Sequence, residues 1–118
     1  MTTSDNQIER AESILDAAET LIVRYGYDKT TVSDIAREAG ISKGAIYLSF
    51  ESKEALFEAL LRREIAMHTA RWIELVEADP RGGTIGAMYR NTLRALDERP
   101  FMAAMFRQDR TVMGTYPK

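Results

Sequence analysis

The side chains of this 118-residue chain that are best suited to a specific chemistry lie between positions 31 and 53, in the run TVSDIAREAGISKGAIYLSFESK. The run combines hydroxyl groups, ammonium groups and very small side chains. Hydroxyl and ammonium groups bind phosphate oxygens, and small side chains allow a backbone to approach the edges of bases. These residue types therefore indicate binding of a nucleic acid.

Two short helices must position these side chains. The pattern predicts one helix over roughly residues 32–39 and another over roughly residues 43–50, joined by a tight turn at Gly40. Ala36 is small enough for the two helices to cross closely, and a glycine at the turn adopts the positive φ that a sharp reversal needs. Helices joined in this way form a helix-turn-helix, whose second helix lies in the major groove of DNA.

The outward residues of the second helix suit a DNA surface. Lys43 is able to reach a guanine edge or a phosphate, Gly44 and Ala45 leave room for close approach, and Ala45 is also able to touch a thymine methyl group. The residues expected to bind flanking phosphates are Thr31, Ser33, Tyr47, Ser49 and Lys53. The alternative is a capped helical hairpin in a bundle whose exposed residues bind nothing, and the complete spacing makes it the weaker interpretation.

Apolar residues recur at helical spacing along the whole chain, and no stretch alternates apolar and polar residues as a strand does. Hydroxyl side chains stand where helices are expected to begin, and a glycine stands where the first is expected to end. The expected N-caps are Thr31 (in a capping box with Asp34), Ser42, Ser52 and Thr84, and the expected C-cap is Gly26.

The remaining elements are a long helix after Ser52, of about 25 residues, and a helix breaker at residues 79–83. A short helix over residues 101–106 and a frayed tail over residues 111–118 complete the chain. Between the breaker and the short helix, a fifth helix bears Ile85, Met88, Tyr89, Leu93 and Leu96. We therefore predict an all-α fold with a helix-turn-helix DNA-binding domain at residues 1–52 and a second helical part at residues 53–118.

The composition narrows the class of protein. With 45% hydrophobic and 29% charged residues, the chain is an ordinary globular one, and the lack of cysteine excludes disulfides and cysteine-ligated metals. The polar N-terminus and the lack of a long apolar run predict a cytoplasmic protein without a membrane span. The net charge is −2, and residues 29–53 carry only +1, so affinity for DNA should depend on hydroxyls, amides and a dimeric footprint.

A second group of residues, soft and aromatic, is a candidate for binding a small effector. It consists of His68, Trp72, Met88, Tyr89 and Met105. The alternative is that these residues are part of an ordinary hydrophobic core. Methionine and aromatic residues at helical spacing favour this alternative. His68 is the only histidine, and with no cysteine present it has no companions for a metal site.

Other charged residues indicate no chemistry of their own. The arginines of the second half are expected on solvated helix faces, namely Arg62, Arg63, Arg90, Arg94 and Arg99. No nucleophile–base pair, phosphate-binding loop or pair of catalytic carboxylates is present in the sequence, so we predict neither an enzyme nor a cofactor.

The run from Thr30 to Leu56, TTVSDIAREAGISKGAIYLSFESKEAL, resembles the DNA-binding head of the tetracycline-repressor (TetR) family of bacterial regulators. The aromatic-Gly-aromatic sequence at residues 25–27 extends the resemblance into the first helix. The resemblance implies a transcriptional repressor that binds operator DNA as a homodimer and is released by a small effector. It also implies that residues 53–118 are part of a truncated helical effector and dimerisation domain. The DNA contacts that it implies are Thr31, Ser33, Lys43, Gly44, Ala45, Tyr47, Leu48, Ser49 and Lys53.

Two departures from the family pattern bear on function. The family usually has an aromatic or polar residue where this chain has Leu48, and often His, Tyr or Asn where it has Ser49, so any contact of Leu48 is apolar. Members of the family also commonly extend well beyond residue 118, which makes this chain either a fragment or a naturally shortened form. The alternative function is therefore a helical protein-interaction module, or a truncated remnant that no longer binds DNA.

Overall fold

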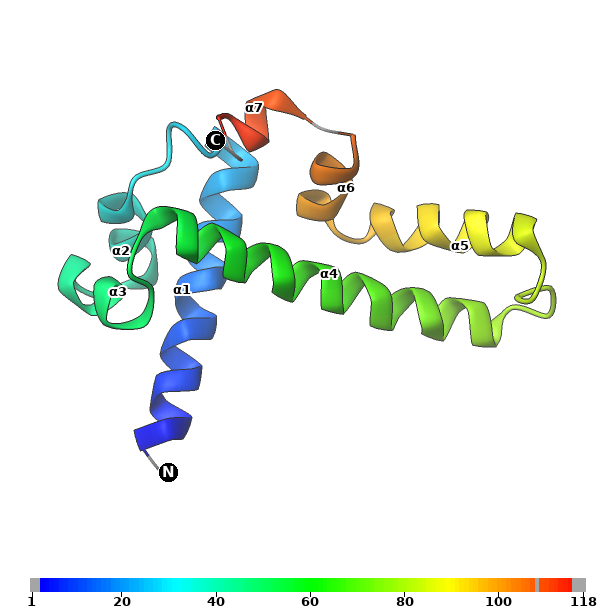
Figure 1. Cartoon of the computed structure of the whole chain (residues 1–118), viewed down its shortest axis with the longest axis horizontal. Helices are drawn as coiled ribbons and strands as arrows, with labels where there is room; N and C mark the ends of the chain where they lie inside the picture. The colour runs from blue at the N-terminus through cyan, green and yellow to red at the C-terminus, as the bar shows by residue number, and fades with distance from the viewer. Residues whose placement is uncertain (1–2, 108, 116–118) are drawn as a thin grey trace.

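The computed structural model of the chain describes residues 3–107 and 109–115 and contains, within these residues, helices but no strand (Figure 1). The all-α prediction is confirmed. None of the described helices is both long enough and apolar enough to cross a membrane. The helices are α1 (Thr3–Tyr25), α2 (Val32–Ala39), α3 (Lys43–Ser49), α4 (Lys53–Ala78), α5 (Ile85–Asp97), α6 (Pro100–Phe106) and α7 (Arg110–Met113).

Local hydrogen bonds define α2 and α3 as the sequence predicts. The hydroxyl of Thr31 accepts from the amide of Asp34 at 3.0 Å, and the amide of Thr31 donates to the Asp34 carboxylate at 3.1 Å, so the capping box is complete. Gly40 ends α2 with φ 73°, and the Ser42 hydroxyl caps α3 by accepting from the amide of Ala45. The helix-turn-helix is thus fixed by contacts that span at most a few residues.

The long helix α4 leaves the head and forms an antiparallel hairpin with α5 (Figure 1). Ser52 caps its start by accepting from the amide of Ala55. At the far end, the Asp79 carboxylate accepts from the backbone amide of Arg81 at 2.8 Å and from the side chains of Arg90 and Asn91 at 3.0 Å. These hydrogen bonds hold the pKa of Asp79 down at about 2, so the turn keeps an ionised carboxylate at its centre.

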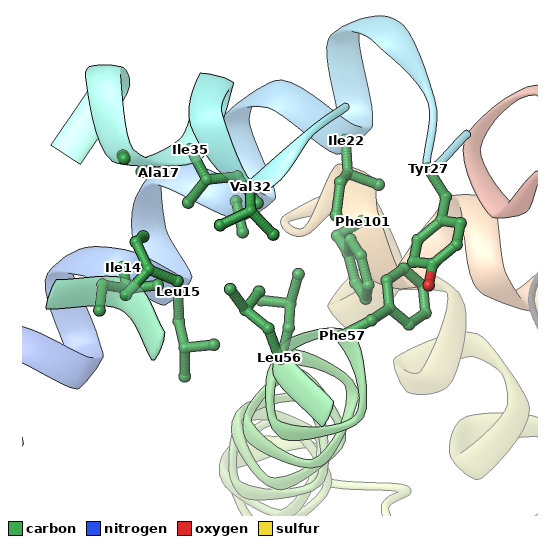
Figure 2. Packing of buried hydrophobic residues seen from close by; sticks show 14 of the residues in the cluster. Ile14, Leu15, Ala17, Ile22, Tyr27, Val32, Ile35, Leu56, Phe57 and Phe101 are labelled. Carbon is green, nitrogen blue, oxygen red and sulfur yellow. The ribbon is translucent and has the colours of Figure 1, made fainter. Parts of the chain in front are cut away.

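A single apolar core joins the head to the helices that follow it. Tyr27 meets Phe57 edge to face with ring centroids 4.8 Å apart, and Phe57 lies 5.8 Å from Phe101 of α6 (Figure 2). The same core includes residues of α1, α2 and α3, and Val112 of α7. The division of the chain at residue 52 stays a prediction.

The large apolar residues expected on the fifth helix are mostly exposed. Ile85 is 87% exposed and Tyr89 is 67% exposed, whereas the residues of α5 that are buried include Ala87, Asn91 and Ala95. The small side chains of Ala87 and Ala95 allow α5 to lie close to α4, and of the five apolar residues expected on this helix Leu96 alone is buried. An apolar surface therefore remains along the α4–α5 hairpin.

The prediction of a frayed tail over residues 111–118 is wrong for residues 111–115, the part of the tail that the structure describes. Residues 110–113 form α7, where Val112 is buried and its carbonyl accepts from the amide of Tyr27 at 2.8 Å. The amide and hydroxyl of Thr115 both donate to the Asp28 carboxylate, at 3.0 and 2.7 Å. These contacts lie more than 80 residues apart in sequence, so local pattern does not reveal them. Residues 116–118 lie outside the described part of the chain.

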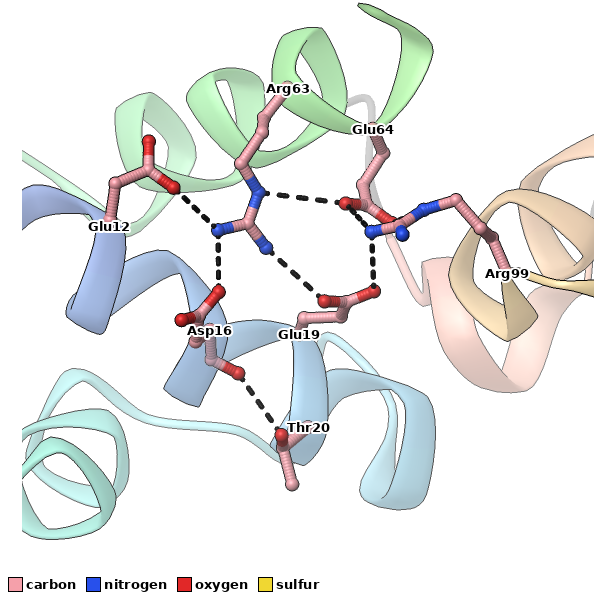
Figure 3. Close-up of polar contacts among 7 residues, drawn as sticks. All are labelled: Glu12, Asp16, Glu19, Thr20, Arg63, Glu64 and Arg99. Atoms are coloured by element: carbon pink, nitrogen blue, oxygen red, sulfur yellow. Dashed lines mark hydrogen bonds and ion pairs between the residues drawn. The ribbon is translucent and has the colours of Figure 1, made fainter. Parts of the chain in front are cut away.

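The expectation that the arginines are solvated is wrong for Arg63 and Arg99, because both belong to an ionic cluster between α1, α4 and the start of α6 (Figure 3). The Arg63 side chain is only 12% exposed. It pairs at 3.2, 2.7 and 3.2 Å with three carboxylates of α1, those of Glu12, Asp16 and Glu19. Arg99 pairs with Glu64, whose side chain is completely buried. The cluster ties the first helix of the head to α4 and α6.

Candidate nucleic-acid interface

The helix α3 is anchored to the core at one point and is open on the opposite side. Ile46 is 1% exposed, whereas Tyr47 is 47% and Leu48 is 81% exposed. At 100° per residue, Gly44 and Leu48 lie on the side of α3 opposite Ile46. Figure 1 places α3 at the edge of the molecule, away from α5, α6 and α7. An outward surface suited to a large ligand is therefore available.

The outward face of α3 is small where it must come closest to a ligand. A Cβ atom built on Gly44 would meet only the Ser42 hydroxyl, at 3.9 Å, and φ there is not positive. The fold itself therefore does not require glycine at this position. Its small size leaves room for an external group, which agrees with the predicted approach of the helix backbone to base edges.

The structure gives the predicted site residues different degrees of exposure. Six of them are exposed, namely Thr31, Ser33, Lys43, Gly44, Tyr47 and Leu48. The other three, Ala45, Ser49 and Lys53, are half-buried. They come from the starts of α2 and α4 and from α3, elements that adjoin one another in the head (Figure 1). Their contact with DNA stays a prediction.

The start of α2 carries a fixed negative charge beside the candidate phosphate ligands. Hydrogen bonds from the backbone and side chain of Thr31 lower the pKa of Asp34, so its carboxylate is ionised. Arg37 pairs with it at 3.3 Å and partly compensates the charge. This arrangement orients Thr31 rigidly but adds little attraction for phosphate.

The start of α4 is electrostatically more favourable for an anion. Lys53 is the first residue of this 26-residue helix, so its ammonium group adds to the positive end of the helix dipole. The ammonium nitrogen lies 4.0 Å from the centroid of the Tyr27 ring. Sequence reasoning did not find Tyr27 as a neighbour of Lys53, because the two are far apart in the chain and no motif relates them.

The five effector candidates differ in burial and in the contacts that the structure gives them. The indole nitrogen of Trp72 donates to the backbone carbonyl of Met88 at 3.1 Å, which joins α4 to α5. Tyr89 is exposed, and Met105 packs against the apolar core. His68 is half-buried, with a buried Nδ1 that has no hydrogen-bond partner among the described residues. A role in binding an effector stays a prediction for all five.

The ionic cluster around Glu64 was missed by sequence reasoning, although the sequence contains a signal for part of it. Glu12, Asp16 and Glu19 follow one another at four- and three-residue steps, which places three carboxylates on one face of α1. Such a face needs cations from elsewhere in the fold. Arg63 and Arg99 supply them.

Comparison with known proteins relates this sequence and fold to a family. Residues 14–60 match the family described as bacterial regulatory proteins, tetR family. The chain is 38% identical over 99 residues to the HTH-type transcriptional repressor Rv1474c of Mycobacterium tuberculosis, a match that covers 84% of this chain and 49% of that protein. It is 36% identical to the HTH-type transcriptional regulator TtgR of Pseudomonas putida, covering 81% of this chain and 45% of that protein.

A solved structure shares the fold. A TetR-family transcriptional regulator from Haemophilus influenzae superposes with a TM-score of 0.63 at 23% identity, covering 98% of this chain and 62% of that one. The chain spans about half the length of the curated relatives named above.

Proposed function

This chain belongs to the tetR family of bacterial regulatory proteins, and from that premise we propose that it is a DNA-binding transcriptional regulator, most simply a repressor. The observation that carries the proposal is the outward face of α3, where Lys43, Gly44 and Tyr47 are exposed on a helix that the core holds by Ile46. Binding of operator DNA would place the protein in the bacterial cytoplasm.

In this proposal, α3 enters the major groove, and the starts of α2 and α4 contact the flanking phosphates. Lys43 and Ala45 face base edges, where a cation reads guanine and a methyl group reads thymine. Thr31, Ser33 and Tyr47 donate hydroxyl hydrogen bonds to phosphate, and Lys53 adds a cation at the start of α4. Of the remaining predicted contacts, Gly44 lies near the start of α3, and Leu48 and Ser49 lie at its C-terminal end.

Regulation follows from pairing two such heads. In a homodimer, the two α3 helices would meet half-sites about 34–36 Å apart or a multiple of that distance. A small effector bound among α4, α5 and α6 would tilt α4 and change the separation of the heads. We propose His68, Trp72, Met88, Tyr89 and Met105 as the residues nearest such an effector, and residues 53–118 as the part of the chain that carries it.

The test is a gel-shift titration with duplex DNA selected by the chain from a random library. Lys43→Ala and Tyr47→Ala should each weaken binding about tenfold, the loss of one good contact, while helicity is unchanged. Arg81→Ala is the matched control, because it also removes an exposed cation but lies in the α4–α5 turn, far from α3. Equal binding by all four proteins would contradict the proposal.

A second function, a helical module that pairs with another protein and does not bind DNA, is favoured by one observation. Leu48 is 81% exposed at the C-terminal end of α3, within the proposed DNA surface, where an apolar side chain is unusual. The two functions differ in their response to salt. Binding of a protein to DNA releases counterions from the phosphates, and this release becomes less favourable as the salt concentration rises. A DNA-binding head therefore loses affinity steeply with salt, whereas an apolar protein contact does not.

A further inference from the structure

A hollow of about 390 Å³ lies between the N-terminal half of α1 and the C-terminal end of α3, and its lining residues are Gln7, Arg10, Ala11, Leu48 and Ser49. We propose that Arg10 binds a backbone phosphate of the DNA in this hollow, so that α1 is a further part of the DNA-binding surface. The inference rests on the proposed function. Arg10 precedes residues 14–60, the segment that matches the tetR family, so the family match does not supply this contact.

The polar groups that line the hollow are suited to a phosphate. The guanidinium group of Arg10 and the amide of Gln7 present N–H donors, and the hydroxyl of Ser49 presents an O–H donor. None of the five lining residues is acidic. A guanidinium group is able to donate two parallel N–H bonds to a phosphate, which a lysine ammonium group is not. The hollow therefore offers a cation and further donors to an anion.

The charges of α1 lie on different sides of the helix. Arg63 of α4 pairs with three carboxylates of α1, those of Glu12, Asp16 and Glu19. At 100° per residue, Arg10 lies about 120–180° around the helix from these three residues. Ile14, one turn further along the side that carries Arg10, is completely buried in the core. The Arg10 side of α1 therefore faces the head, away from the ionic cluster, and the carboxylates that pair with Arg63 do not neutralise it.

The hollow adjoins the outward face of α3. Leu48, which is 81% exposed on that face, forms one wall of the hollow, and Ser49 is the last residue of the helix. Figure 1 shows that the N-terminal part of α1 extends beyond α2 and α3. An arginine on this part of α1 is therefore able to contact a ligand that lies against the end of α3.

The length of α3 brings a phosphate to the hollow in the proposed complex. The helix has seven residues and is about 10 Å long, close to the width of the major groove, which is about 12 Å. A helix of this length that lies across the groove ends beside the sugar–phosphate backbone that borders it. Arg10 is exposed at that end and provides the charge that Leu48 and Ser49 lack.

The experiment is a salt titration of DNA binding by the whole chain, with a short random-sequence duplex as the probe. Contacts with phosphate do not depend on base sequence, so no operator is needed. The test variants are Arg10→Gln, which removes the charge, and Arg10→Lys, which keeps it. The matched control is Arg24→Gln, because Arg24 is also an exposed arginine of α1 but lies about 21 Å further along the helix.

We expect Arg10→Gln to make the slope of log affinity against log salt less negative by about 0.9 for each bound head, and to weaken binding about five- to tenfold at 0.1 M salt. Arg10→Lys should keep the slope, because the release of counterions depends on charge. Arg24→Gln should bind as the unsubstituted chain does. An unchanged slope for Arg10→Gln would overturn the inference, and so would an equal change of slope for Arg24→Gln, which would be an effect of net charge alone.

An NMR titration of the unsubstituted chain with the same duplex tests the contact without a substitution. The side-chain Nε–H resonance of Arg10 should shift on binding, and that of Arg24 should not. An unperturbed Arg10 resonance in the complex would overturn the inference. Failure of the proposed function gives a different result, because the unsubstituted chain would then show no salt-dependent binding to the duplex.

Discussion

Arg99 forms a two-point ion pair with Glu64, with its Nε 3.0 Å from one carboxylate oxygen and its Nη2 2.5 Å from the other. The Glu64 side chain is completely buried in α4, and Arg99 is the residue that precedes α6. The same guanidinium lies 3.7 Å from Glu19 of α1. One arginine thus connects the first helix of the head, the long helix α4 and the start of α6 (Figure 3).

Arg99→Met should destabilise the fold by about 3 kcal/mol, because removal of one partner leaves a buried carboxylate without its main compensating charge. The matched control is Arg71→Met. Arg71 makes an equally close pair with Glu98, with Nε 2.7 Å from a carboxylate oxygen, but both side chains are more than 40% exposed. Such a pair contributes less than about 1 kcal/mol. Urea denaturation of the two variants measures the difference, and equal losses would show that burial of Glu64 does not matter.

The ionic cluster also makes stability depend on pH near neutrality. The pKa of Glu19 is raised from 4.5 to about 7, first by burial and then by the hydrogen bond and negative charge of Glu64, against the opposing effect of Arg99 and Arg63. The folded chain therefore binds this proton more tightly than the unfolded chain. The proton bound at Glu19 therefore stabilises the fold. Its contribution to the free energy of unfolding is complete below about pH 4.5 and is lost as the pH rises through about 7, a loss of at most about 3 kcal/mol.

Glu19→Gln tests this dependence, because a glutamine keeps the shape and cannot ionise. We expect the variant and the unsubstituted chain to have similar free energies of unfolding at pH 4, and the variant to be the more stable at pH 8. Glu12→Gln is the control, since Glu12 also pairs with Arg63 but its side chain is 57% exposed. If Glu19→Gln showed the same fall in stability with pH as the unsubstituted chain, the cluster would not hold the proton at Glu19.

The parts of the fold that the sequence predicts correctly are those that depend on near neighbours. The Thr31–Asp34 box, the positive φ of Gly40 and the Ser42 cap each involve atoms within a few residues of one another. Their geometry follows from residue types at short spacing and does not require a contact with a distant part of the chain. The helix-turn-helix was therefore predictable in detail.

The parts that escape prediction depend on contacts between distant segments. Arg63 and Arg99 look like ordinary surface arginines in sequence, yet they pair with carboxylates of distant segments, for example Glu12, 51 residues from Arg63, and Glu64, 35 residues from Arg99. The docking of Val112 on Tyr27 is of the same kind. In the candidate site, the types of residue are readable from sequence, whereas the contact of Lys53 with Tyr27 appears only when the turn after α1 meets the start of α4.

Two glycines in open space should respond in opposite directions to substitution by alanine. A Cβ atom on Gly40 or on Gly86 meets nothing within 4 Å, so neither substitution creates a clash. Gly40 has φ 73°, and a side chain in that conformation costs about 1–2 kcal/mol, so Gly40→Ala should lower the free energy of unfolding by about 1 kcal/mol. Gly86 lies within α5, where alanine is favoured over glycine by about 0.8–1 kcal/mol, so Gly86→Ala should raise it. Chemical denaturation of both variants gives the two signs, and a stabilising effect of Gly40→Ala would mean that the turn between α2 and α3 does not require the left-handed conformation.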